Sequence, residues 1–174
     1  MTPLAEEYRR RAAQDHDIRV QMPVLYAWAC HAQRIIELGV RGGNSASAFL
    51  AGLERSGGQL WSVDIEGPQV PDWWNFPFWH FLRADDTAPE AVAFCPDGAD
   101  VLFIDTSHYY PYTLQELRLY VPKVRPGGIV LLHDTDRAEW PDVGRSLDEF
   151  CGETGLSWYS HDFHHGLGVI EIPA

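Results

Sequence analysis

The sequence IIELGVRGGNSAS, at residues 35–47, decides the fold of this chain. Its first residues favour a buried β-strand, and a run rich in glycine follows at once. Glycine adopts positive φ readily and lets the backbone approach a ligand with no Cβ in the way. Asn44 or Ser45 can then cap a helix, whose free first-turn N–H groups point back at the turn. The segment therefore predicts a strand, a turn and a helix that cradle a small-molecule cofactor.

The spacing of the turn excludes two nucleotide-binding motifs. A dinucleotide fingerprint that starts at Gly39 needs glycines where this chain has Arg41 and Asn44, and a P-loop needs a lysine that is missing here. The observed spacing is E-x-G-x-x-x-G, and its acidic residue is Glu37. A carboxylate at the turn repels a pyrophosphate and attracts an ammonium group, so we expect a ligand with a cationic amino-acid end.

At this motif the chain resembles the class I S-adenosylmethionine-dependent methyltransferases, whose first motif has the same form. The resemblance implies S-adenosylmethionine as the cofactor, bound by residues at the ends of the first four strands. The expected cofactor-binding residues are Glu37, Gly39, Gly43, Ser45, Asp64, Ile65, Asp85 and Asp105.

Further strands follow at the intervals that a Rossmann-like fold requires. Residues 59–63 predict a second strand that ends at Asp64, where an acidic side chain can bind both hydroxyls of a ribose. A third strand is predicted at residues 79–82 and leads to Asp85, where the resemblance implies a contact with the adenine. Residues 101–104 are apolar throughout, as expected for a fourth strand with helices on both faces.

The remaining elements continue this alternation of strands and helices. Helices are predicted at residues 114–121 and 143–151, and strands at residues 129–132, 156–159 and 168–172. We predict an α/β, Rossmann-like, doubly wound and mostly parallel seven-stranded sheet, with one antiparallel strand near the C-terminus. Residues 1–174 are expected to form a single methyltransferase domain, with a helical cap at 1–33 and the core at 34–174.

Composition narrows the class of partner. The chain has 13 lysines and arginines against 25 acidic residues, and its net charge of −12 argues against a nucleic-acid substrate. The three cysteines follow no pattern typical of disulfides or zinc sites. The charged N-terminus does not look like a signal peptide, and no apolar run approaches a membrane span. We therefore expect a cytoplasmic protein that contacts neither membrane nor nucleic acid.

The reaction type depends on the residues after the fourth and fifth strands. Asp105 and His108 follow the fourth, and His133 and Asp134 end the fifth. Because ligands bind at the carboxyl ends of parallel strands, these side chains should converge beside the cofactor. Carboxylates and an imidazole can bind a divalent cation that lowers the pKa of a substrate hydroxyl, while His108 removes its proton. This chemistry predicts O-methylation, with His108 and Asp105 as catalytic residues.

The run D-x-S-H-x-Y, followed by R-P-G-G and a strand that ends H-D, narrows the resemblance. It is similar to the metal-dependent O-methyltransferases that include macrocin and mycinamicin sugar methyltransferases and cephalosporin-hydroxylase-like proteins. That branch implies Asp105, His133 and Asp134 as metal ligands and magnesium as the first choice of cation. The chain departs from the branch at His133, where an acidic residue is usual, and an imidazole also suits manganese, iron or zinc.

Several alternatives stay open at this point. Asp64, Asp105 and Asp134 can cap helices, and His133 can point away from the metal. The chain can also be a catalytically inactive S-adenosylmethionine-binding partner, or a metal-independent methyltransferase. The N/D-P-P-Y/F motif typical of amino-group methylation is missing after the fourth strand. His161, His164 and His165 resemble a metal cluster but are interpreted as loop residues at a cavity mouth.

The acceptor is expected to be a small molecule with a hydroxyl, such as a sugar, a glycoside or a phenol. The resemblance implies secondary metabolism, antibiotic biosynthesis above all. An aromatic loop at residues 73–81 is interpreted as a lid or a dimer contact in preference to core packing. The N-terminal helices at residues 1–33 offer a second surface through which the chain can form a homo-oligomer.

Overall fold

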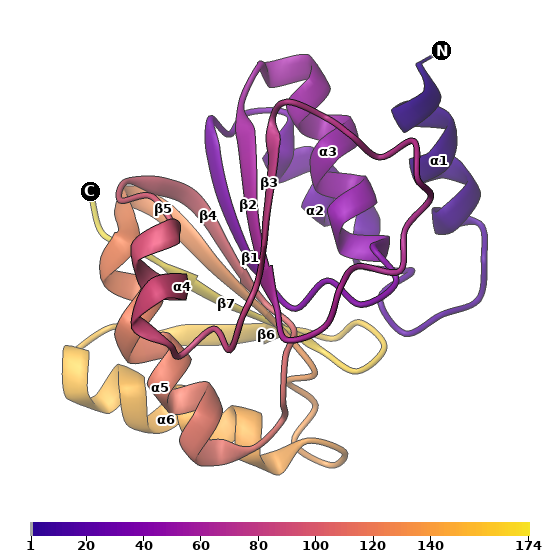
Figure 1. Cartoon of the computed structure of the whole chain (residues 1–174). Helices are drawn as coiled ribbons and strands as arrows, with labels where there is room; N and C mark the ends of the chain where they lie inside the picture. Colours follow the sequence, from indigo (N-terminus) through magenta and orange to yellow (C-terminus); the bar gives the residue numbers. More distant parts are fainter. Residues whose placement is uncertain (1) are drawn as a thin grey trace.

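Residues 2–174, which the computed structural model describes, form a seven-stranded sheet with helices on both faces (Figure 1). The strands are β1 (Arg34–Leu38), β2 (Gln59–Asp64), β3 (Trp79–Arg83), β4 (Ala99–Ile104), β5 (Val124–His133), β6 (Trp158–His161) and β7 (Leu167–Glu171). The helices are α1 (Pro3–Ala12), α2 (Met22–Ala29), α3 (Asn44–Ser56), α4 (Pro89–Phe94), α5 (Tyr110–Tyr120) and α6 (Pro141–Thr154), and a 3-10 turn, η1 (Val121–Lys123), follows α5.

The strand order β3-β2-β1-β4-β5-β7-β6 confirms the predicted fold class. Strands β1 to β5 pair in parallel, and β7 lies antiparallel between β5 and β6. The order reverses between β1 and β4, which is the switch point where doubly wound sheets bind their ligands. Leu38 at the end of β1 aligns with Val63 and Ile104 on its two neighbours, so the chain leaves all three strands at one level.

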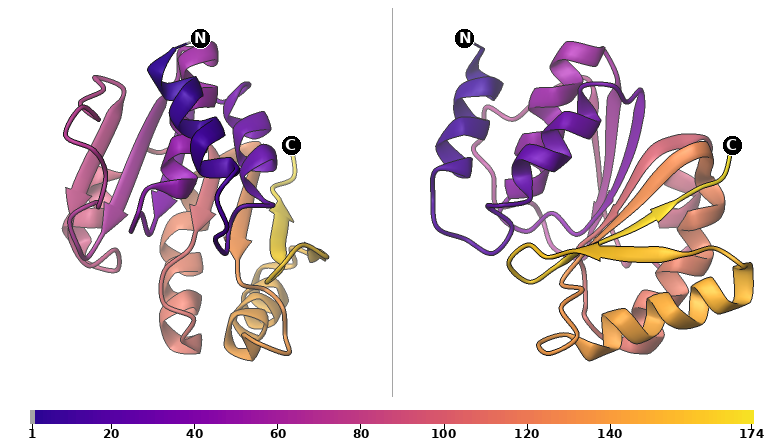
Figure 2. Two further views of the ribbon diagram at one scale, coloured as in Figure 1. Left: turned by 90° about the vertical axis from the view of Figure 1, so that its right-hand side faces the viewer. Right: turned by 180° about the vertical axis from the view of Figure 1, so that it is seen from behind.

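Successive residues of the central strands face opposite layers, as the period of two in a strand requires. In β4, Val101 and Phe103 pack against α1, α2 and α3, while Leu102 and Ile104 pack against α4, α5 and α6. Figure 2 shows these two groups of helices on opposite sides of the sheet. Burial on both faces explains why the central strands contain almost only apolar residues.

The turn after β1 brings two strand ends into contact. Gly39 has a φ of 87°, and a Cβ there would lie 2.0 Å from the backbone oxygen of Asp105. Gly43 has a φ of 77° and is the residue that caps α3, so the prediction of Asn44 or Ser45 at that position is wrong. Glycine suits this position because its φ is left-handed and a Cβ there would lie 2.6 Å from the Val70 side chain. Asn44 is instead the first helical residue.

Some element bounds differ from the predictions. Helix α5 begins at Tyr110, four residues before the predicted start, because Pro111 fits the first turn of a helix. Strand β5 begins at Val124, since its first residue pairs with Ala99 before a register shift. The short helix α4 was not predicted from the sequence.

The aromatic loop between β2 and β3 contributes the buried Trp74 to the core on the α1–α3 side of the sheet, with Phe76 and Phe78 partly buried against it. Among the described residues it forms no helix, in agreement with its proline content. The prediction of a lid or dimer contact is wrong for Trp74, which is 6% exposed, with the Arg11 guanidinium 5.1 Å from its ring centre. Trp73 is the exposed aromatic side chain of this loop. Within residues 2–174, the helices are too short or too polar to cross a bilayer.

Candidate active site

Two cavities meet at the carboxyl edge of the sheet. The larger has a volume of about 580 Å³ and lies over the ends of β1, β2, β3 and β4. The second, of about 340 Å³, lies between the glycine turn and the segment that joins α1 to α2. Arg41 and Asp105 line both cavities. The other residues of the larger cavity are Gly39, Asp64, Ile65, Glu66, Asp85, Asp86, Thr106, Ser107 and Tyr112.

Asp64 holds the glycine turn in place. Its Oδ2 accepts hydrogen bonds from the backbone N–H groups of Val40 and Arg41 at 2.7 and 2.8 Å, and its Oδ1 accepts one from Glu66. These bonds fix the carboxylate beside the larger cavity, where the sequence predicted a ribose contact. The next residue, Ile65, is 68% exposed and offers an apolar side chain to the same cavity.

Glu37 lies beneath the turn and does not reach either cavity. It is 0% exposed, and its two carboxylate oxygens accept hydrogen bonds from Ser45 and Ser62 at 2.6 Å each. Burial raises the pKa of Glu37 to about 7, although the two serine hydroxyls lower it. In this placement Glu37 lines neither cavity, and its predicted contact with an ammonium group stays a prediction. Its hydrogen-bond partner Ser45 lines the smaller cavity.

Acidic residues also surround the far end of the larger cavity. Asp85 accepts hydrogen bonds from Thr87 and, at 2.9 Å, from the Tyr112 hydroxyl, and these bonds lower its pKa. Behind it lie the buried carboxyls of Asp86 and Glu116, and burial raises the pKa of both. The adjacent acids at the end of β3 could have indicated Asp86, but Glu116 lies mid-helix in α5 with no signal in its local sequence.

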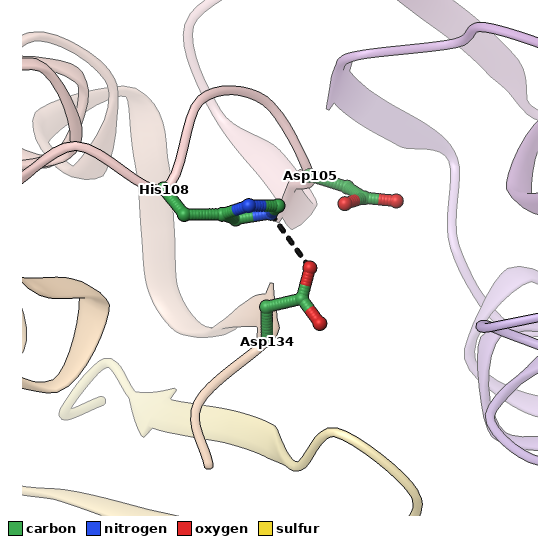
Figure 3. A group of neighbouring side chains, drawn as sticks. All are labelled: Asp105, His108 and Asp134. Atoms are coloured by element: carbon green, nitrogen blue, oxygen red, sulfur yellow. Dashed lines mark ion pairs between the residues drawn. The ribbon is translucent and has the colours of Figure 1, made fainter. Parts of the chain in front are cut away.

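Asp105, His108 and Asp134 form the chemically distinctive part of the site (Figure 3). They come from the ends of β4 and β5, and each offers a ligand atom within 4.8 Å of the others. His108 Nε2 lies 2.6 Å from Asp134 Oδ2. Two carboxylates and an imidazole at this spacing fit one divalent cation.

Asp134 is held in an unusual backbone conformation. Its φ of 58° lies in the left-handed region, where an aspartate is uncommon, and its side chain is largely buried. Burial raises the pKa of Asp134, but hydrogen bonds from His108 and His133 outweigh it and keep the pKa well below its usual range. Backbone strain of this kind is found most often at functional sites.

His133 lies behind the cluster, and its side chain is only 1% exposed. Its Nδ1 lies 3.0 Å from an oxygen of Asp134 and 3.3 Å from one of Asp105. Burial lowers the pKa of His133, but the two carboxylates raise it to about 10. The structure therefore brings the predicted ligands together and adds His108 to Asp105 and Asp134 in one group of ligand atoms, while His133 as a ligand stays a prediction.

His164 and His165 lie in the loop between β6 and β7, as predicted, whereas His161 is the last residue of β6, so the interpretation as a loop residue is wrong for it. His164 and His165 line a third cavity, of about 430 Å³, with Asp15, His16, Asp17, Arg19 and Val20. His165 Nδ1 lies 2.5 Å from a carboxylate oxygen of Glu139. Over residues 2–174 these histidines join no group of metal-ligand atoms.

Comparison with known families and curated proteins agrees with this geometry. A family model described as a methyltransferase domain matches residues 36–135, more than half of the 174-residue chain. Uncharacterized protein y4gI of Sinorhizobium fredii is 26% identical over 164 residues, which cover 82% of this chain and 18% of that protein. A mimivirus relative, protein R132, is 30% identical over 66 residues and is covered over 30% of its length. The chain thus spans less than a third of either curated relative.

Solved structures share the fold at low sequence identity. MycE, a methyltransferase of the mycinamycin biosynthetic pathway solved with Mg and SAH, has a TM-score of 0.65 and 18% identity. The match covers 98% of this chain and 53% of MycE. The SAH-bound methyltransferase PaMTH1 of Podospora anserina has a TM-score of 0.67 and 15% identity, over 100% of this chain and 89% of that one.

Proposed function

Because the chain belongs to the methyltransferase-domain family, we propose that it transfers the methyl group of S-adenosylmethionine to a hydroxyl of a small molecule. The observation that carries the proposal is the position of Asp105. Its side chain belongs to the group formed by Asp105, His108 and Asp134, called here the acid–imidazole group. The residue also lines both cavities at the switch point of the sheet. A methyl donor that spans the two cavities would therefore carry its methyl group past Asp105, beside a group suited to deprotonate an acceptor hydroxyl.

The larger cavity suits the nucleoside part of the cofactor. Its volume of about 580 Å³ is within the usual range for small-molecule sites. In this proposal Asp64 accepts hydrogen bonds from the ribose hydroxyls, Ile65 covers one face of the adenine, and Asp85 accepts a hydrogen bond from its amino group. MycE and PaMTH1, which share the fold, were solved with SAH bound.

Asp105, His108 and Asp134 would hold a divalent cation, with magnesium as the first candidate and manganese as the second. Such a cation, when bound, lowers the pKa of an acceptor hydroxyl and orients its oxygen. In this route Asp105, whose side chain is 29% exposed, faces the acceptor, and Asp134, whose side chain is 7% exposed, is the buried ligand. Mg is present in the MycE structure.

A metal-independent route is the second candidate, and one distance favours it. With His108 Nε2 2.6 Å from Asp134, the carboxylate orients the imidazole as it does in catalytic pairs that remove a hydroxyl proton. In this route Nε2 carries the hydrogen that Asp134 accepts and Nδ1 takes the hydroxyl proton, so Nε2 cannot also bind a metal. The two routes are therefore exclusive at this atom.

The proposal is tested in two steps that do not require the acceptor. Calorimetric titration with S-adenosylmethionine should give a dissociation constant of roughly micromolar to tens of micromolar. No binding up to millimolar cofactor, in folded protein free of copurified ligand, would refute the cofactor. Titration with Mn²⁺ should then show one site that EDTA reverses, and no such site would favour the metal-independent route.

Once an acceptor is found, turnover measured with and without EDTA distinguishes the two routes. Lost turnover that Mg²⁺ or Mn²⁺ restores supports the metal route, and unchanged turnover supports catalysis by His108 and Asp134 alone. Sugars, glycosides and phenols are the acceptors to screen first, because MycE acts in the mycinamycin pathway and shares the fold. The single-domain organisation and a homo-oligomer formed through the N-terminal helices or residues 73–81 stay predictions.

A further inference from the structure

The burial of Glu37 leaves the amino-acid end of the proposed cofactor without its expected partner. Both oxygens of Glu37 are occupied by serine hydroxyls, and the side chain is 0% exposed. The smaller cavity, next to the glycine turn, contains two other carboxylates, those of Asp17 and Asp105. Asp105 belongs to the acid–imidazole group, so Asp17 is the carboxylate left to meet an ammonium group.

Asp17 lies in the segment between α1 and α2, which is anchored at both ends. On one side, Arg11 in α1 donates hydrogen bonds to the Gly42 carbonyl at 2.5 Å and to Asn44 Oδ1 at 3.0 Å. On the other side, Gln21 donates to the carbonyl of Gly166 at 3.0 Å. The segment is therefore fixed against the glycine turn and the β6–β7 loop, with Asp17 over the cavity between them.

His16 provides a second acceptor in the same segment. Its Nε2 lies 3.1 Å from the backbone oxygen of Arg11, and this contact requires Nε2 to carry a hydrogen. In the neutral ring Nδ1 is then an acceptor, and it is buried without a hydrogen-bond partner. It lies 4.0 Å from Asp17 Oδ1. An ammonium nitrogen about 2.9 Å from each atom would bridge this gap, with an angle of roughly 90° between its two bonds.

Arg41 provides a positive charge beside Asp17, which suits the carboxylate of an amino acid. Its Nη1 lies 3.6 Å from Asp17 Oδ2, and the residue lines both cavities. A free amino acid carries an ammonium and a carboxylate on one carbon, so an adjacent acid and base match both groups. Asn44 and Ser45, the first residues of α3, line the same cavity, and the free N–H groups of a helix's first turn favour a carboxylate.

We infer that Asp17 and His16 bind the α-ammonium group of the cofactor and that Arg41 faces its α-carboxylate. The inference rests on the proposed function, since it assumes S-adenosylmethionine. It assigns recognition of the amino-acid end to a segment outside residues 36–135, the part that the family model matches. The motif acid Glu37 is then a support for Ser45 and makes no contact with the ligand.

Two ligands that differ only at this end test the inference. S-adenosylhomocysteine has the amino-acid end, and 5′-methylthioadenosine has the same nucleoside and thioether without it. Asp17→Asn should weaken S-adenosylhomocysteine about tenfold in calorimetric titration and change 5′-methylthioadenosine less than about twofold. Asp15→Asn is the matched control, because it removes the same charge from the same segment and Asp15 does not line the smaller cavity. It should change neither affinity.

The outcomes separate the inference from the proposed function. Unchanged S-adenosylhomocysteine affinity in Asp17→Asn, or equal weakening of both ligands, overturns the inference and leaves the cofactor in place. Equal weakening of S-adenosylhomocysteine by Asp15→Asn also overturns it, because the effect would then be one of net charge. If the unsubstituted protein binds neither ligand, the proposed cofactor fails and the inference fails with it.

Discussion

The ends of β1 and β5 each bury a carboxylate, and the two carboxylates respond in opposite ways. Glu37 is 0% exposed and Asp134 is 5% exposed, so both have lost almost all contact with water. Burial raises the pKa of Glu37 to about 7, whereas that of Asp134 lies well below its usual range. The difference is in their partners, which are two serine hydroxyls for Glu37 and two imidazoles for Asp134.

The comparison distinguishes Glu37, a carboxylate that supports the site, from Asp134, a carboxylate suited to its chemistry. A neutral hydroxyl offsets only part of the cost of burying a charge, while an imidazolium offsets it by Coulomb attraction. Glu37 can therefore take up a proton near neutral pH and still hold the turn through hydrogen bonds. Asp134 stays charged next to a cavity, in a strained backbone conformation, as a metal ligand or a base-orienting residue must.

The largest effect is expected at Asp134, the buried carboxylate that stays charged. Asp134→Asn keeps the side-chain size and tolerates the positive φ, but it removes the charge. We expect the Mn²⁺ affinity to fall by at least about 100-fold, and turnover on any acceptor with it, while S-adenosylmethionine still binds. Calorimetric titration with Mn²⁺ and with the cofactor measures both effects on one sample.

Asp136→Asn is the matched control for this substitution. Asp136 lies in the same loop and is exposed, and its Oδ1 accepts a hydrogen bond from Ala138 N–H that an asparagine can also accept. It should leave Mn²⁺ binding unchanged. Retained Mn²⁺ affinity in Asp134→Asn would show that the buried charge at β5 serves the fold and not a metal.

Much of this arrangement could be predicted from the sequence. The alternation of apolar runs and glycine turns gave the fold, because each run had to be buried on both sheet faces. The position of Asp64, Asp105 and Asp134 at strand ends followed from the topology, since parallel strands end at one edge. These predictions combine local sequence patterns with the general rule that parallel strands end at one edge of the sheet.

The partners of the two buried carboxylates could not be predicted. Ser62 reaches Glu37 from β2, 25 residues away, and only the register of two strands brings them together. Asp134 contacts both His108 and His133 from a backbone with positive φ, and no sequence signal indicates that conformation at an aspartate. The position of His16 and Asp17 over the glycine turn depends on long-range bonds of Arg11.

A second prediction concerns the glycine that joins the two regions. In Gly39→Ala the new Cβ would lie 2.0 Å from the backbone oxygen of Asp105, and φ is 87°. Because a backbone atom cannot move aside, we expect a loss of about 3 kcal/mol or more in the free energy of unfolding. Gly43→Ala would meet the Val70 side chain at 2.6 Å, which can move, so it should cost less. Urea denaturation of both variants tests this order, and equal costs would contradict it.

A third prediction tests the protonation of Glu37. Its folded-state pKa of about 7 is above the ordinary glutamate value of 4.5, so the folded protein binds the proton more tightly. This contribution to stability is fully present below pH 4.5 and is lost as the pH rises through 7. Glu37→Gln mimics the protonated form. Relative to this variant, the unsubstituted protein should lose roughly 2 kcal/mol of unfolding free energy between pH 5 and pH 8. A constant difference across this range would mean that Glu37 stays charged when buried.

The smallest effect is expected at one of the two serines that hold Glu37. Ser62→Ala removes a donor to the carboxylate and also the acceptor of the Trp79 indole N–H, which lies 3.0 Å from Ser62 Oγ. The cost should be about 1 kcal/mol, because a neutral hydrogen bond contributes little net stability. The loss of a donor also raises the pKa of Glu37 further, so the pH at which stability declines should move upward. Urea denaturation from pH 5 to pH 9, with Ser62→Ala compared in the Glu37→Gln background, separates the two effects. An unchanged pH profile would mean that Ser45 alone sets the proton affinity of Glu37, and the β1 end would then depend on a single hydroxyl.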